Sequence, residues 1–262
     1  MDTVFQFRID NLKTKVLKDR AELGKVAASD AADKIKSLLK IKNELRIVFA
    51  AAPSQNEFLE ELLKHEIDWS RITAFHMDEY IGLCKDSPQL FSYYLKTHLF
   101  KKVNFKNVFY LNSINEDNKE ECSRYSKLLN ESPIDIVFMG IGENGHIAFN
   151  DPPVADFKDK ETVKIVELEA LCKQQQVNDG CFSSVEDVPK YAFTLTVPAL
   201  LSAEYLSVAV PGKRKAEAVY KTLFDEISTK CPATILRKHK NAVLYIDKNS
   251  LSLSTEKIKS FK

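Results

Sequence analysis

Short apolar runs alternate with amphipathic segments along most of the chain. LRIVFA at 45–50 and IDIVFM at 134–139 are typical of strands that are buried on both faces of a parallel sheet. Similar patterns predict further strands at 72–76, 107–111, 192–197, 206–210 and 242–246. Helical patterns are expected at 16–39, 54–63, 87–99, 120–129 and 214–224.

This alternation predicts the fold class. Strands separated by helices favour an α/β fold with an open, mostly parallel sheet and helices on both faces. Because no linker, repeat or low-complexity tract interrupts the pattern, we expect a single domain over residues 1–262. Ligands of such sheets bind beyond the carboxyl ends of the strands. The loops after Ala50, His76, Met139 and Val210 are therefore where chemistry is expected.

Two helix starts carry local signals. Ser54 is followed three residues later by Glu57, which predicts a capping box. Ser87 and Pro88 predict another helix start, with the serine as cap and the proline in the first turn.

Composition narrows the function classes. The net charge is +1 and the pI about 7.6, so the chain lacks the large positive charge that binds nucleic acid or an anionic membrane surface. No apolar run approaches the roughly 18 residues of a membrane span, and the N-terminus lacks a secretory pattern. The five cysteines are odd in number and contain no CxxC pair, so we expect a reducing, cytoplasmic location without disulfides.

A glycine loop follows the clearest strand. The segment GIGENGH at 140–146 matches GxGxxG, the pattern of a dinucleotide-binding site. That site needs a helix to begin in the loop, and Pro152 and Pro153 prevent a long helix here. A tight turn without chemistry is the alternative interpretation. Against it stands His146, which ends the loop and can move protons near neutral pH.

A second candidate follows the strand at 72–76. His76-Met77-Asp78-Glu79-Tyr80 places carboxylates at the carboxyl end of that strand. Asp78 suits a base that moves a proton between C1 and C2 of a sugar, although an aspartate that caps a turn is the plain alternative. His76 fits a packed strand residue. No set of His, Cys and Asp has metal-ligand spacing, so no metal is predicted.

Four segments resemble one enzyme family. FHMDEYIGL at 75–83 and GIGENGHIAFNDP at 140–152 are similar to the signature loops of glucosamine-6-phosphate deaminases. VPKYA at 188–192 and PGKRKA at 211–216 look similar as well, and the resemblance runs from about residue 30 to 247. The 6-phosphogluconolactonases share this fold, but GHIAFN and MDEY favour the deaminase side.

The resemblance implies a cofactor-free conversion of an aldose into a ketose with release of ammonia. His146 would open the sugar ring, and Asp78 would carry a proton between C2 and C1. Asn144 and Asp151 would complete the catalytic set. The resemblance assigns substrate binding to five positions: Ser54, Glu79, Gly142, Gly145 and Lys215. The implied partner is a small sugar phosphate, and a homo-oligomer is one option for the assembly.

The chain departs from the family pattern at several positions. Asn144 stands where the deaminases have an aspartate, and Asp151 stands where they have a glutamate. An asparagine can orient the histidine but supplies no charge. The phosphate loop reads AAAPSQN at 50–56, with Ser54 in place of a threonine, and an arginine expected at 179–182 is missing. Lys213 and Arg214 are the candidates to compensate.

These departures leave three functions open. The first is an amino-sugar phosphate deaminase/isomerase of the glucosamine-6-phosphate or galactosamine-6-phosphate type. The second is a 6-phosphogluconolactonase-like hydrolase with His146 as general base on water. The third is a sugar-phosphate sensor without catalysis. The altered phosphate loop also admits a sugar whose phosphate is placed differently, or one without a phosphate.

Overall fold

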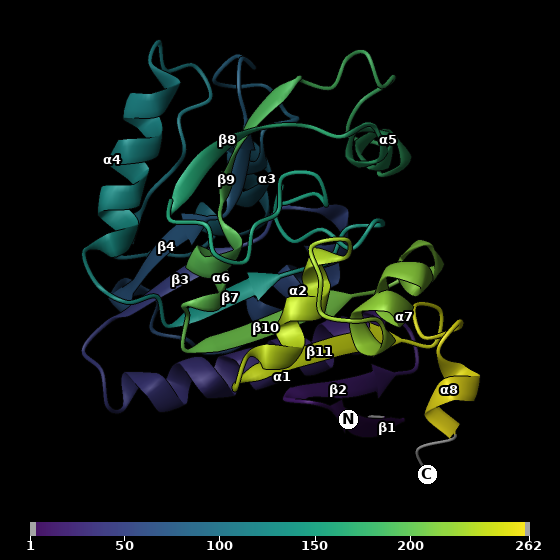
Figure 1. Ribbon diagram of the computed structural model, residues 1–262. Helices are drawn as coiled ribbons and strands as arrows, with labels where there is room; N and C mark the ends of the chain where they lie inside the picture. The colour runs from purple at the N-terminus through teal and green to yellow at the C-terminus, as the bar shows by residue number, and fades with distance from the viewer. Residues whose placement is uncertain (1–3, 260–262) are drawn as a thin grey trace.

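Two β-sheets organise the chain in the computed structural model, which describes residues 4–259. The larger sheet has eight strands in the order β1-β2-β11-β10-β7-β3-β4-β6. Apart from the antiparallel pair β1 and β2, its neighbours run parallel. The smaller sheet is antiparallel, in the order β5-β9-β8. Figure 1 shows β8, β9 and helix α5 above the large sheet, away from both chain ends.

The strands of the large sheet are short, and most of its central members are fully buried. Their bounds are β1 Phe5–Ile9, β2 Leu12–Leu17, β3 Leu45–Phe49, β4 Ile72–His76, β6 Asn107–Val108, β7 Ile136–Met139, β10 Tyr205–Val210 and β11 Ala242–Asp247. The smaller sheet consists of β5 Asp78–Tyr80, β8 Val163–Glu167 and β9 Tyr191–Leu195.

Helices connect the strands and cover both faces. The α-helices are α1 Arg20–Leu39, α2 Asn56–Leu62, α3 Phe91–Leu95, α4 Asn118–Asn130, α5 Ala170–Asn178, α6 Val197–Leu201, α7 Ala216–Phe224 and α8 Thr255–Lys259. Short 3-10 turns are η1 Pro53–Gln55, η2 Trp69–Arg71, η4 Lys213–Lys215 and η5 Pro232–Lys238, and η3 Lys96–Phe100 is a π-helix.

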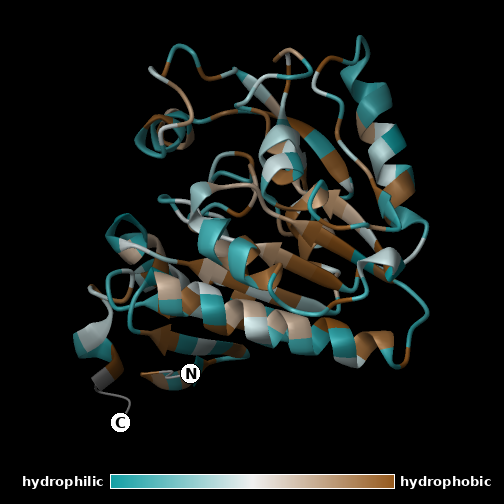
Figure 2. Cartoon of the chain, turned by 180° about the vertical axis from the view of Figure 1, so that it is seen from behind, coloured by the Kyte–Doolittle hydropathy of each residue, from teal (hydrophilic) through white to brown (hydrophobic). Residues whose placement is uncertain are grey.

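The pleat of the central strands divides the core into two layers, because successive side chains point to opposite faces. Phe49 and Phe138 lie on one face with α1 and α2, and Val48 and Val137 lie on the other with α4, α6 and α7. Figure 2 shows α1 crossing the sheet, with its apolar residues interrupted by polar ones. The predicted sheet covered on both faces is thus confirmed.

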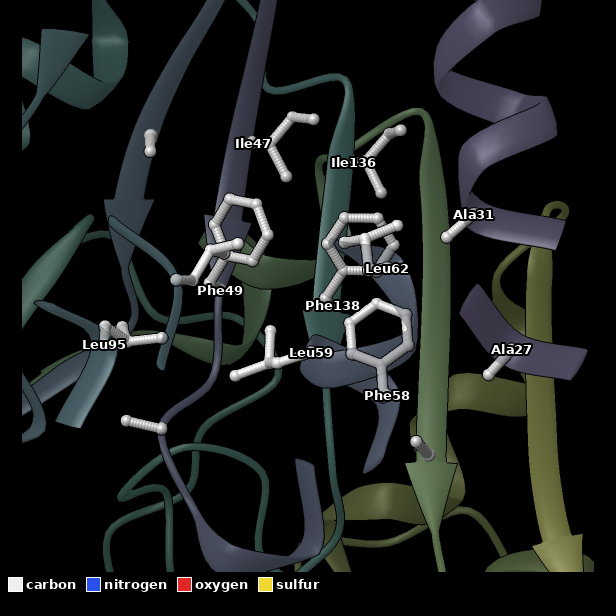
Figure 3. Packing of buried hydrophobic residues seen from close by; sticks show 14 of the residues in the cluster. Ala27, Ala31, Ile47, Phe49, Phe58, Leu59, Leu62, Leu95, Ile136 and Phe138 are labelled. Atoms are coloured by element: carbon white, nitrogen blue, oxygen red, sulfur yellow. The ribbon is translucent and has the colours of Figure 1, made fainter. Parts of the chain in front are cut away.

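Aromatic rings fill the layer between the sheet and α2. The ring of Phe138 lies 5.3 Å from that of Phe49 and 5.0 Å from that of Phe58. Figure 3 shows these rings between the strands and the helices, with Ala27 and Ala31 of α1 beside them. Small alanines let the long helix approach the sheet closely.

The structure corrects the expected start of the chain. Residues 5–17 form the hairpin β1–β2, whereas the sequence pattern extended the first helix back to Val16. In β2 the residues Leu12, Thr14 and Val16 are buried and alternate with half-buried ones, which is the period of a strand. The helix begins after Asp19, whose carboxylate accepts the N–H of Glu22.

The second sheet is the main feature that the sequence pattern did not predict. Strand β9, expected in the parallel sheet, instead pairs antiparallel with both β5 and β8. Strand β8 and helix α5 were not predicted at all. Pairing partners lie far apart in the chain, and a single strand pattern does not identify its neighbours.

Both predicted helix caps are wrong. The turn at Ser54 begins instead at Pro53, and Glu57 pairs with Arg20 rather than with the backbone. The helix expected from Ser87 begins at Phe91, and the N–H of Ser87 closes a turn with Cys84.

Candidate active site

A cleft of about 490 Å³ opens at the carboxyl ends of the central parallel strands. The segments that line it follow β3, β4, β7 and β10, which are the four loops expected to carry chemistry. Helix α3 and the end of α5 form the opposite wall. Of the predicted residues, the cleft is lined by Ser54, Asp78, Gly142, His146 and Lys215.

The glycine loop turns back so that His146 packs against it. The N–H of Gly142 donates to the carbonyl of His146 at 2.9 Å, and a Cβ on Gly142 would come within 2.2 Å of the imidazole. Gly142 is therefore required for the close approach of the ring. Gly145 has a φ of 87°, and a Cβ there would meet the Cys231 sulfur at 2.4 Å. Gly145 thus shapes the loop and does not line the cleft.

His146 lies beside a buried carboxylate. Its Nδ1 is 2.9 Å from Oδ1 of Asp151, and the two side chains are 9% and 1% exposed. Burial opposes ionisation of Asp151, but the charge of His146 and hydrogen bonds from His146, Asn144 and Cys172 outweigh it, so the pKa of Asp151 is lowered. Asp151 is therefore the charged partner of the histidine. Nε2 of the ring has no partner among residues 4–259 and remains for a ligand in the cleft.

Asn144 forms hydrogen bonds with both His146 and Asp151. Its amide nitrogen donates to Oδ1 of Asp151 at 2.8 Å and to Oε2 of Glu169 at 3.0 Å. Its oxygen accepts the backbone N–H of His146 at 3.1 Å. Asn144 thus contacts the backbone of the histidine and the carboxylate beside its ring.

Asp78 occupies a different environment in the same cleft. It lies on β5, opposite Thr194, and is 7% exposed. Within the described part of the chain its carboxylate accepts no hydrogen bond, and burial, followed by the charge of Glu79, raises its pKa well above the usual range. His76 is fully buried, with Nδ1 2.9 Å from the carbonyl of Asp78 and Nε2 accepting the N–H of Leu111. His76 therefore fixes the backbone that carries Asp78.

The prediction that Glu79 contacts substrate does not fit its position. Its side chain is fully buried and does not line the cleft. Its carboxylate accepts the backbone N–H groups of Tyr80, Phe91 and Ser92. Burial raises its pKa to about 7, although these hydrogen bonds favour the charged form. Glu79 alternates with Asp78 along a strand, so the two side chains point to opposite faces.

Lys215 supplies a cation to the cleft. The residue is 7% exposed, and its ammonium has neither an ion pair nor a hydrogen bond within the described residues. Burial lowers its pKa, while the charges of Asp179 and Glu143 oppose that effect. A buried cation without a partner is costly, which indicates a place for an anionic group of a ligand. Ser54, whose Oγ is 3.1 Å from Nε2 of Gln55, adds a hydroxyl to the wall.

The neighbouring arginine is already engaged. Arg214 pairs with Asp179 at 2.9 Å, approaches Glu143 at 3.5 Å and donates to the carbonyl of Asn178. Asp179 lines the cleft, but Arg214 does not. The arginine therefore ties the end of α5 to η4 and neutralises Asp179, so Lys215 remains the lysine that faces the cleft.

Three buried side chains beside the cleft carry atoms that can ligate a metal ion. The ligand atoms of His146, Asp151 and Cys172 lie within 4.8 Å of one another. The sequence spacing did not reveal this set, because Cys172 lies on α5 and only the fold brings its sulfur to His146 and Asp151. Burial raises the pKa of the Cys172 thiol well above its usual range, whereas a metal ligand must be a thiolate. The absence of a metal therefore stays a prediction.

Sequence reasoning missed the contribution of α5. Glu169 and Cys172 contact the group around His146, and Gln175 accepts the N–H of Glu143 at 2.7 Å. The alternation in VKIVE at 163–167, followed by a helical pattern, was the available signal. Tyr94 and His98, which stack with centroids 4.0 Å apart, also line the cleft unexpectedly.

Comparison with known proteins agrees with this geometry. The family model described as glucosamine-6-phosphate isomerases/6-phosphogluconolactonase matches residues 18–245. The chain belongs to this family. A glucosamine-6-phosphate deaminase of Bacillus cereus (strain B4264) is 34% identical over 224 residues, 86% of this chain and 84% of that protein. The deaminase of Bacillus thuringiensis (strain Al Hakam) is 33% identical over the same lengths.

Solved structures of the family share the fold. A monomeric glucosamine-6-phosphate deaminase superposes with a TM-score of 0.84 at 31% identity, covering 92% of this chain and 99% of that one. A 6-phosphogluconolactonase from Thermotoga maritima gives 0.75 at 21% identity, covering 90% and 100%, and shows the fold alone. Residues 4–259 contain no helix long and apolar enough to cross a membrane.

Proposed function

We propose that this chain is a deaminating isomerase of an amino-sugar phosphate, of the glucosamine-6-phosphate or galactosamine-6-phosphate type. The observation that carries the proposal is the pairing in one cleft of two unlike buried groups. Among residues 4–259 no group donates a hydrogen bond to the Asp78 carboxylate, whereas the His146 ring lies against the carboxylate of Asp151. Groups whose environments push their pKa values apart suit the two halves of a proton transfer.

Each side chain then has a defined task. His146 moves a proton between the C1 hydroxyl and the ring oxygen, which opens the ring to the aldehyde. Asp78 takes the proton from C2 and returns it to C1 through an enol-type intermediate. Water adds to the resulting C2 imine, and the C–N bond breaks to release ammonia. C1 is reduced as C2 is oxidised, so the net change is amino-sugar phosphate plus water to ketose phosphate plus ammonia.

Lys215 supports a phosphorylated substrate. Its buried ammonium lacks a partner within residues 4–259, and a phosphate monoester would supply two negative charges. Ser54 and the backbone of the loop after β3 lie in the wall of the same cleft. This assignment of the anion to Lys215 explains why the cleft contains a lysine that forms no ion pair within residues 4–259.

The test is a substrate panel. Ammonia release is followed with glucosamine 6-phosphate, galactosamine 6-phosphate and both unphosphorylated sugars. Lys215→Ala should raise KM for the phosphorylated substrate by at least about 10-fold with a smaller change in kcat, because the lost contact stabilises bound phosphate in ground and transition states alike. Lys213→Ala, an exposed neighbour, is the matched control.

Adding 6-phosphogluconolactone to the panel distinguishes the alternative functions. Hydrolysis of 6-phosphogluconolactone without ammonia release would assign the lactonase reaction. Binding of a sugar phosphate without either reaction would favour the sensor. Ammonia from an unphosphorylated sugar with unchanged KM in Lys215→Ala would remove the phosphate from the proposal.

We also propose a cytoplasmic location. All five cysteines are free thiols, as suits a reducing compartment. A homo-oligomer stays a prediction, and the 31% identical solved deaminase is described as monomeric. Light scattering of the purified chain distinguishes the two assemblies.

A further inference from the structure

One face of α5 lies against the glycine loop. Glu169 precedes the helix, Cys172 is in its first turn and Gln175 is one turn further, so the spacing of three residues places the side chains on one face. Cys172 and Gln175 are buried. Gln175 holds the loop through the N–H of Glu143 at 2.7 Å. This polar face is therefore turned toward the protein interior at the active site.

The Asn144 amide lies between two carboxylates. A primary amide has two N–H donors, and here one goes to Asp151 and the other to Glu169, at 2.8 and 3.0 Å. A carboxylate at position 144 would leave three negative groups together without these donors. The amide at 144 thus suits both acids, and its hydrogen bond links it to Glu169.

The thiol of Cys172 lies close to Asp151 and is positioned as a second donor to its carboxylate. Cys172 is 1% exposed and its sulfur lies within 4.8 Å of the Asp151 and His146 ligand atoms. Burial and the charge of Asp151 keep the thiol protonated by raising its pKa, and its hydrogen bond lowers the pKa of Asp151. A neutral thiol is a weak hydrogen-bond donor, but in a buried site each donor helps to stabilise an ionised carboxylate.

We propose that Glu169 and Cys172 are positioning residues of the proton-transfer group. Glu169 orients the Asn144 amide toward Asp151, and Cys172 donates to the same carboxylate. Together they hold Asp151 in contact with Nδ1 of His146. The ring then keeps its proton on Nδ1 and presents Nε2 to the cleft. The activity readout of this inference rests on the proposed function, whereas the tautomer readout does not.

The activity test compares removal of each group with its conservative replacement. Glu169→Ala and Cys172→Ala should each lower kcat about 10-fold or more while KM changes little, as for other groups that orient a reactive residue. Glu169→Gln and Cys172→Ser keep an acceptor and a donor and should retain more activity. Glu167→Ala, exposed on β8, and Cys122→Ala, half-buried on α4, are matched controls. Glucosamine 6-phosphate is the probe, and a chelator is present because of the donor cluster at His146.

A double-variant cycle tests the pairing of positions 144 and 169. Asn144→Asp brings a third carboxylate to Asp151 and Glu169 and should lower kcat more than the single loss of Glu169. Combining it with Glu169→Gln removes one charge and should recover part of the loss. If the kcat of the double variant equals the product of the two single effects to within about twofold, the pairing is contradicted.

The second readout is the tautomer of the His146 ring, measured by nitrogen NMR of histidine-labelled protein. His146→Gln identifies the signal among the five histidines. The wild type should carry its neutral-form proton on Nδ1, and Glu169→Ala and Cys172→Ala should increase the Nε2-protonated fraction. Thermal unfolding confirms that each variant is folded.

The outcomes separate the two proposals. A tautomer shift in the Ala variants supports the positioning role even if the wild type releases no ammonia, in which case the proposed function fails alone. Folded Ala variants with the wild-type tautomer overturn the positioning role, whatever their activity. If an Ala variant does not fold, Cys172→Ser and Glu169→Gln are measured in its place. A tautomer that differs from the wild type, together with a lower kcat, supports the positioning role. A wild-type tautomer and a wild-type kcat in Asn144→Asp overturn it.

Discussion

The two sides of the cleft treat a buried aspartate in opposite ways. Asp78, on β5, accepts no hydrogen bond within the described chain, and burial raises its pKa. Asp151, after the glycine loop, is also buried, but the charge of His146 and several donors overcome burial and lower its pKa. Burial alone therefore does not decide the charge of a carboxylate. The donors around it do, and they suit Asp78 to exchange a proton and Asp151 to stay ionised.

The largest expected effect is that of Asp78→Asn. If Asp78 carries the proton between C2 and C1, the amide should lower kcat by about 10²- to 10⁴-fold, because it cannot accept a proton. Ammonia release in a steady-state assay measures this. Asp86→Asn, in an exposed loop, should behave as the wild type. Activity above about a tenth of the wild type in Asp78→Asn would remove this residue from the reaction.

The second effect is that of Asp151→Asn. The amide keeps the shape but not the charge beside Nδ1, so we expect a fall in kcat of about 10²-fold. Asp151→Glu keeps the charge and should retain more activity if the extra methylene is accommodated. Asp156→Asn, exposed nearby, is the control. Equal activity of the Asn and Glu variants would contradict a role for the charge.

The pH profile sharpens the contrast between the two carboxylates. Because burial raises the pKa of Asp78, kcat/KM should fall as the pH decreases through a value well above the ordinary aspartate range of about 4. Because the pKa of Asp151 is lowered, Asp151→Asn should reduce the rate without moving this acidic limb. An acidic limb that moves in Asp151→Asn and stays in place in a weakly active Asp78 variant would reverse the assignment.

The smallest effect concerns stability and the histidine that holds Asp78. Burial lowers the pKa of His76 from 6.5 to about 3, so the unfolded chain binds more protons between these values. The contribution of His76 to stability is therefore complete above pH 6.5 and is lost as the pH falls toward 3. His76→Gln, which does not titrate and retains a donor and an acceptor, should lose less free energy of unfolding over this window.

Chemical denaturation of both proteins at several pH values measures the difference. His65→Gln, a half-buried histidine outside the cleft, is the control and should follow the wild type. A parallel decline of wild type and His76→Gln would show that His76 is not held neutral.

The sequence predicted the central strands because each is a short apolar run buried on both faces. LRIVFA, IDIVFM and the run at 206–210 became β3, β7 and β10, and the loops after them line the cleft. The hairpin β1–β2 and the sheet β5-β9-β8 were missed, since alternation over a few residues does not reveal which distant strand is the partner. Fold class thus follows from local pattern, whereas the second sheet depends on long-range pairing.

The residues of the candidate site also divide into those that the sequence indicates and those that only the fold brings together. Asp78 and His146 were singled out because they follow strands whose ends meet at one edge, whereas Ser54 and Lys215 came from the resemblance to the family, and all four line the cleft. Glu79 was misplaced because the alternation of β5 turns it into the interior. Glu169 and Cys172 were missed since only the fold brings α5 to the glycine loop.

Exchange of solvent deuterium into C1 of fructose 6-phosphate, measured with ammonium present so that the C2 imine can form, tests the central claim most directly, because the exchange reports the proton transfer at C1. The ketose opens without help from the enzyme, so the exchange isolates the group that acts at C1. We expect exchange in the wild type, loss of exchange in Asp78→Asn and retention of most exchange in Asp151→Asn. Exchange that survives in Asp78→Asn and disappears in Asp151→Asn would contradict the division of roles between the two carboxylates.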